Sequence, residues 1–81
     1  MQVKLFVSDG GPAHDVTAHA FADLGDLTVY SLSEMDGLAA ASAHGIDRTP
    51  SMVVVDSGGR EVAAWRGTLP GVAELRALLA N

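Results

Sequence analysis

Because cysteine is absent, the side chains best able to take part in catalysis or metal binding are three histidines and ten carboxylates. The chain of 81 residues contains His14, His19 and His44 and no cysteine. Without a thiol it forms no disulfide, no thiolate nucleophile and no zinc site built from cysteine. The chemistry left open is acid–base catalysis, metal binding by histidine, and recognition.

The spacing of the histidines argues against a metal site. His14 and His19 are five positions apart, whereas side chains on one helix face recur at three or four positions. His44 belongs to a different predicted element. We therefore expect solvated histidines, and neither a metal nor another cofactor.

Four acids flank the second predicted strand: Asp23, Asp26, Glu34 and Asp36. An acidic catalytic pair is one interpretation. The alternative, which we favour, is a solvated rim that keeps the protein in solution. With a solvated rim expected here and no cysteine in the chain to carry thiol chemistry, we do not expect an enzyme.

The charge balance argues against nucleic acid and membrane partners. The net charge is −5, and the five basic residues form no run, whereas nucleic-acid binding depends on neutralising phosphates. The apolar stretches fall far short of the roughly 20 residues of a membrane span. Residues 1–8 are too short for a signal peptide, so we expect a cytoplasmic location.

The elements that must position these residues alternate between strand and helix. Runs rich in β-branched, aromatic and other apolar residues predict strands over 3–8, 27–31, 52–55 and 60–66. The third is apolar on both faces and is expected to be central. The turn signal Asp56-Ser57-Gly58-Gly59 predicts a hairpin between the last two.

Helical spacing of apolar residues predicts three helices. The first follows Pro12 and ends near Leu24. The second is expected to be capped by Ser33 or Asp36 and ended by Gly45, with His44 in its last turn, where positive charge is favoured. The third runs from Pro70 onward, with Val72, Leu75 and Leu79 on one side.

The predicted order is βαβ, helix, β-hairpin and final helix. Because such crossovers are right-handed, the first two strands are expected to be parallel, and the hairpin adds an antiparallel pair. The sequence thus predicts one α/β domain over residues 1–81, a four-stranded mixed sheet with helices on both faces.

Two loops carry a more specific signal. The run Asp9-Gly10-Gly11-Pro12-Ala13-His14 connects the first strand to the first helix, and Thr49-Pro50 comes directly before the buried third strand. Proline removes a ladder donor and normally avoids a central strand. It fits here if its peptide bond is cis and makes a tight bend.

This arrangement resembles the thioredoxin and glutaredoxin superfamily over essentially the whole chain, with a length similar to the short glutaredoxin-like members. There a Cys-x-x-Cys motif at the start of the first helix faces a cis-proline loop. The resemblance extends to Gly45–Ser51, to the Ser57–Val62 turn and to Gly67 after the last strand. It implies a thioredoxin-like fold.

The family cysteines have no counterpart here. Aligned as in glutaredoxins they fall on Gly11 and His14, and aligned as in thioredoxins on Gly10 and Ala13. The spacing after the first strand favours the former. Thiol–disulfide exchange needs a thiolate, so neither alignment supports a dithiol oxidoreductase.

The resemblance implies that a binding geometry remains. In the family, the backbone of the residue before the cis-proline, here Thr49, pairs with an extended substrate or with glutathione, a form of strand addition. The start of the first helix adds free N–H groups. The predicted groove consists of Gly11, Pro12, Ala13, His14, Thr49 and Pro50.

Three functions remain open at this point. We favour a redox-inactive module that binds a protein or an extended peptide. The alternatives are a thiol–disulfide oxidoreductase in a cysteine-less form and a glutathione-binding domain. Gly11 and His14 are unusual substitutes for cysteine, which argues against the first alternative.

Two surface features have competing interpretations. Asp47 and Arg48 are expected to pair locally, with ligand contact as the alternative. Trp65, near the end of a predicted edge strand, is expected to cover the sheet, with a role as a partner anchor as the alternative.

Overall fold

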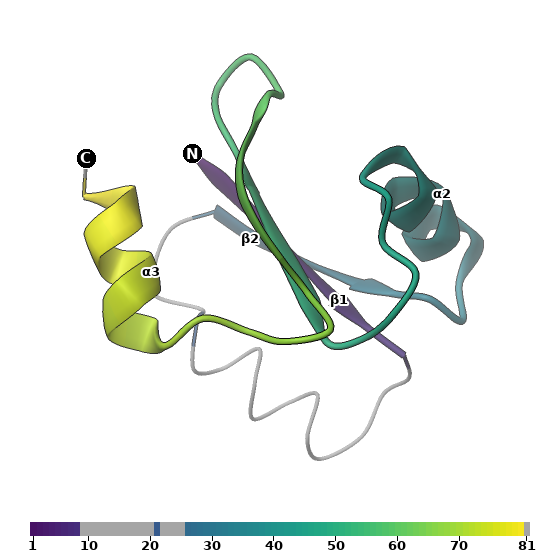
Figure 1. Cartoon of the computed structure of the whole chain (residues 1–81). Helices are drawn as coiled ribbons and strands as arrows, with labels where there is room; N and C mark the ends of the chain where they lie inside the picture. Colours follow the sequence, from purple (N-terminus) through teal and green to yellow (C-terminus); the bar gives the residue numbers. More distant parts are fainter. Residues whose placement is uncertain (9–20, 22–25, 81) are drawn as a thin grey trace.

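The computed structural model describes residues 1–8, 21 and 26–80. These residues form four strands and two helices, labelled as in Figure 1. The elements are β1 (Gln2–Val7), β2 (Asp26–Ser31), α2 (Met35–Ala43), β3 (Ser51–Val55), β4 (Glu61–Arg66) and α3 (Val72–Leu79). Each strand lies within one residue of its predicted bounds at either end. The predicted helix over 12–24 lies outside the described residues, except for Phe21.

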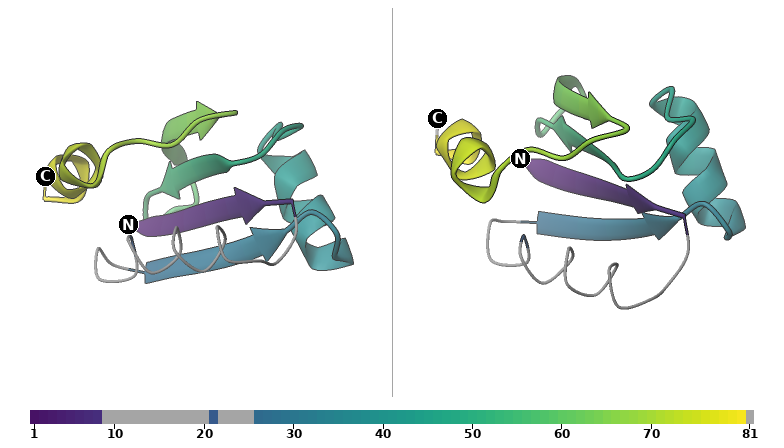
Figure 2. Two further views of the ribbon diagram at one scale, coloured as in Figure 1. Left: turned by 90° about the horizontal axis from the view of Figure 1, so that it is seen from below. Right: turned by 60° about the horizontal axis from the view of Figure 1, so that its bottom comes forward.

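The strands form one mixed sheet in the order β2-β1-β3-β4, seen from two further directions in Figure 2. β1 and β2 are parallel, whereas β3 is antiparallel to both β1 and β4. The predictions of an α/β chain, a four-stranded mixed sheet, a parallel first pair and a closing hairpin are therefore confirmed.

The hairpin turn is held by one carboxylate. Oδ1 of Asp56 accepts hydrogen bonds from the backbone N–H groups of Gly58 and Arg60, each at 2.9 Å. Gly59 has φ of 81°, a left-handed conformation that glycine adopts without steric cost. The β3–β4 ladder is irregular between Val54 and Val55, so this edge of the sheet is not a uniform ribbon.

Two apolar clusters result from the alternation of side chains along the strands. The first contains the odd-numbered residues of β1 together with Met52 and Val54 of β3, and Leu75 of α3 joins it. The second contains Phe6, Val53 and Val55, and Ala41 of α2 joins it. Phe21 is buried in the first cluster.

β3 is buried along its whole length, as expected for a central strand. Met52, Val53 and Val54 are fully buried and Val55 is 2% exposed. Ser51, at the start of the strand, is the one buried polar residue among those the structure describes. Its hydroxyl therefore needs partners, and they are described below with the site.

The start of α2 differs from the prediction that Ser33 or Asp36 caps it. The cap residue is Glu34, with extended backbone (φ −112°, ψ 151°), and its side chain makes no capping hydrogen bond. Asp36 lies inside the first turn, where a negative charge is favourable. At the other end Gly45 has φ of 66°, consistent with its predicted role in ending the helix.

α3 presents the predicted apolar side to the sheet. Leu75 is fully buried, and Val72, Leu78 and Leu79 pack against the same cluster. Neither helix in the described ranges is long and apolar enough to cross a membrane.

We predict that Leu75→Ala lowers the free energy of unfolding by about 2–5 kcal/mol, because it leaves a cavity in a closely packed cluster. Urea denaturation followed by Trp65 fluorescence measures the loss. The matched control is Leu38→Ala on α2, where Leu38 is 54% exposed; a change within about 0.5 kcal/mol is expected there. Equal losses in the two variants would contradict the assigned packing.

Candidate functional site

The loop before β3 carries the described half of the predicted groove. The Thr49-Pro50 peptide bond is cis, as predicted from the sequence. Thr49 is half-buried and Pro50 is exposed. The other predicted groove residues, Gly11 to His14, lie outside the described residues, as do the alternative cysteine positions Gly10 and Ala13.

The hydroxyl of Ser51 holds this loop in place. It donates a hydrogen bond to the carbonyl oxygen of Arg48 at 2.7 Å and accepts one from the backbone N–H of Gly67 at 3.0 Å. One buried side chain thus joins the loop before β3 to the turn after β4. The composition gave no signal for this role, because it depends on two segments that meet only in the folded chain.

The main chain of Thr49 is available for binding. Among the hydrogen bonds of the described residues, none involves the N–H or the C=O of Thr49. Its neighbours are fixed, since the Arg48 carbonyl bonds Ser51 and Ser51 begins the β3 ladder. The loop therefore offers a free peptide group on a rigid support, the arrangement that strand addition uses.

Asp47 and Arg48 form the predicted local pair. Nε of Arg48 lies 3.3 Å from Oδ1 of Asp47, and the side chains are 66% and 77% exposed, respectively. Ion pairs this exposed contribute little to stability. Both residues thus border the loop at the surface.

Trp65 covers the sheet, which was the favoured interpretation. It lies on β4, an edge strand, and its half-buried side chain packs against the first apolar cluster. The alternative role as an exposed anchor is not needed to explain it.

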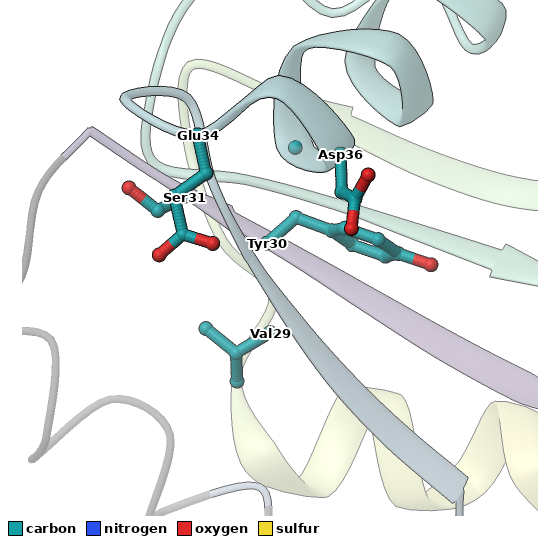
Figure 3. Close-up of a pocket in the computed structure, with 6 residues that line it drawn as sticks. Val29, Tyr30, Ser31, Glu34 and Asp36 are labelled. Carbon is teal, nitrogen blue, oxygen red and sulfur yellow. The ribbon is translucent and has the colours of Figure 1, made fainter.

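Two of the four predicted rim acids border a hollow. Glu34 and Asp36 line a surface pocket of about 280 Å³ beside β2, together with Tyr30 and Gly37. Figure 3 shows Glu34 beside Ser31 and Asp36 beside the ring of Tyr30. Asp26 begins β2, and Asp23 lies outside the described residues. In the described ranges no three residues of the types His, Cys, Asp and Glu are grouped as metal ligands.

His44 lies in a cationic environment rather than in the last helical turn. It follows the end of α2 as the C-terminal cap residue. Nζ of Lys4 lies 3.1 Å from Nε2 of His44. Because an ammonium group only donates, this contact needs Nε2 as an acceptor and so favours the neutral ring. Nη2 of Arg66 donates to the His44 carbonyl at 2.7 Å and to Oε1 of Glu61 at 3.1 Å.

The protonation state of His44 therefore differs from the expectation of a favoured positive charge. Burial and the charge of Lys4 lower the pKa of His44 below its ordinary value of 6.5; Arg66 also lowers it, while Glu61 opposes the shift. The helix end favours a cation, but desolvation and a neighbouring ammonium outweigh it. His14 and His19 lie outside the described residues.

No protein-family model, curated protein or solved structure matches the chain. The resemblance to a known superfamily therefore depends on the sequence motifs of this chain alone.

We predict that Ser51→Ala lowers the free energy of unfolding by about 1–3 kcal/mol, because it removes the buried hydroxyl and leaves the Arg48 carbonyl and the Gly67 N–H without that partner. Denaturation measures the loss, and faster amide exchange at Gly67 locates it. Ser57→Ala, in the exposed hairpin turn, is the control and should change stability by less than about 0.5 kcal/mol. Unchanged exchange at Gly67 would contradict the assigned bond.

We predict that His44 titrates below 6.5 and that Lys4→Met moves its pKa upward. A lowered native pKa means that the unfolded state binds the proton more tightly. The contribution of His44 to stability is thus complete above pH 6.5, the ordinary pKa of histidine, and is lost as the pH falls through the lowered native pKa. Proton NMR of the imidazole measures the pKa, with Arg76→Met on α3 as the control. An unchanged pKa in Lys4→Met would refute the coupling.

Proposed function

We propose that this chain is a thioredoxin-like, redox-inactive module that binds an extended peptide or protein segment through the loop of Thr49 and Pro50. The proposed architecture has helices on both faces of the sheet. Three features support it: the strand order β2-β1-β3-β4, the parallel β1–β2 pair, and the packing of Leu75 and Ala41 in separate clusters.

The observation that carries the proposal is the unpaired main chain of Thr49 on a loop that Ser51 holds. An extended ligand gains affinity from main-chain hydrogen bonds to such a segment. Because the loop is already ordered, binding costs little further conformational entropy there. The cysteine-free composition confines the proposal to recognition, since thiol–disulfide exchange needs a thiolate.

The sequence supplies the second half of the proposed groove. Gly11, Pro12, Ala13 and His14 are expected to face Thr49 from the start of the predicted first helix. Free N–H groups there would favour a carboxylate. A peptide carboxyl terminus and glutathione share this chemistry, so the test uses both.

We predict that an extended peptide shifts the amide resonances of Thr49 and Ser51. The experiment titrates the isotope-labelled protein with a pool of extended peptides and, separately, with glutathione. Thr49→Val should keep the affinity within about twofold, because recognition uses the main chain rather than the hydroxyl. Shifts confined to other surfaces, or none at millimolar ligand, would refute the groove.

A second arm separates binding from a lost catalytic activity. The double variant Gly11→Cys/His14→Cys restores thiols at the preferred family positions. We expect peptide binding at Thr49 without disulfide reductase activity in this variant. Strong reductase activity would instead identify the chain as a cysteine-less form of an oxidoreductase.

A further inference from the structure

We propose that the outer edge of β2 and the acidic hollow beside it bind an extended segment of a partner protein that carries a basic side chain. The hollow is the pocket lined by Val29, Tyr30, Ser31, Glu34, Asp36 and Gly37. This surface is separate from the Thr49 loop, because β1 lies between β2 and β3. The two sites can therefore be tested independently.

Some main-chain N–H and C=O groups of β2 point away from its neighbour β1. β2 is an outermost strand of the sheet, and among the strands that the structure describes it pairs with β1 alone. The N–H of Leu32 donates to the carbonyl of Val7 at 2.9 Å. In a parallel ladder alternate residues face the same neighbour, so Leu27, Val29 and Ser31 direct their main-chain groups away from β1. The Ser31 carbonyl accepts from the Glu34 N–H at 3.1 Å. No hydrogen bond between described residues uses the outward-facing main-chain groups of Leu27 and Val29, so an added strand could pair with them.

Within its own residues, β2 has none of the sequence features that usually protect a sheet edge. Such edges carry lysine, proline, a bulge or a charge in mid-strand. The sequence of β2 is DLTVYS, whose single charge, Asp26, lies at its first residue. Its pairing with β1 is regular over all six residues. The other outermost strand, β4, has charged residues at both ends and the irregular pairing noted above.

The hollow beside β2 would select which side chain an added segment carries. It lies where the carboxyl end of β2 meets the start of α2 (Figure 3). A Cβ on Gly37 would overlap the carbonyl oxygen of Ser31, so glycine permits this close approach. The wall carries two exposed carboxylates and one aromatic ring, and none of the described residues that line it is basic.

The carboxylates of Glu34 and Asp36 determine which kind of segment can bind at this edge. Carboxylates and a tyrosine ring favour a guanidinium or ammonium group. A second copy of this chain would instead bring its own acids to the same edge, at a net charge of −5, and like charges would repel. Met35, between the two acids in sequence, is 87% exposed and offers apolar contact to the same segment. The partner is thus an extended basic segment of another protein.

The test uses a blocked nine-residue peptide of alternating threonine and valine with a central arginine. Titrated into labelled protein at low salt, it should shift the amides of Leu27, Val29 and Ser31 and those of Glu34 to Gly37. Replacing arginine by neutral citrulline should weaken binding about tenfold, the loss expected for a charged hydrogen-bond partner. Equal binding of the two peptides would overturn the role of the acids.

Backbone methylation tests the strand pairing without altering the protein. With arginine fixing the register, alternate peptide N–H groups face β2 and the others face solvent. N-methylation of one alternate set should abolish binding, and methylation of the other should leave it unchanged. Two methylated peptides that both bind like the parent would overturn the edge assignment.

Two protein variants complete the design. Glu34→Gln/Asp36→Asn should weaken the arginine peptide about tenfold, whereas Glu74→Gln, on α3, should leave its affinity within twofold. Sedimentation of the protein alone should show a monomer. A micromolar dimer that Glu34→Gln/Asp36→Asn tightens would overturn the proposal in favour of a second copy, and absence of any shift at millimolar peptide would also overturn it.

Discussion

The complete burial of β3 constrains the rest of the structure. A strand with apolar side chains on both sides must be covered on both, so Met52 and Val54 meet one cluster while Val53 and Val55 meet the other. The strand begins with a polar residue that is buried as deeply. The hydroxyl of Ser51 is hydrogen-bonded to the Arg48 carbonyl in the loop before β3 and to the Gly67 N–H in the turn after β4. The need to pair this buried hydroxyl holds the preceding loop in place.

Local pattern was enough to predict the strands and helices that the structure describes, and tertiary contact decided the rest. Strand bounds, the parallel pair, the hairpin and the cis bond before Pro50 follow from runs and turn residues. The start of α2 does not, because Gly37 approaches the Ser31 carbonyl and no side chain caps the helix. The Lys4–His44 contact spans 40 positions, and its effect on the histidine pKa could not be foreseen from helix position alone.

The candidate site was predicted in part for the same reason. Thr49 and Pro50 could be identified because proline before a buried strand is conspicuous in any sequence. The partners of Ser51 could not, since a serine at a strand end has no local signature of burial. Glu34 and Asp36 were expected to be ordinary solvated acids; they are exposed, and only the fold places them around one hollow.

The unequal edges of the sheet have a consequence for assembly. β4 ends in charges and pairs irregularly with β3, whereas β2 is regular and almost uncharged. A strand could be added at the β2 edge, but the β4 edge is less suited to accept one. Growth by repeated edge pairing requires two compatible edges on each subunit, so two unequal edges of this kind disfavour polymerisation into a fibre.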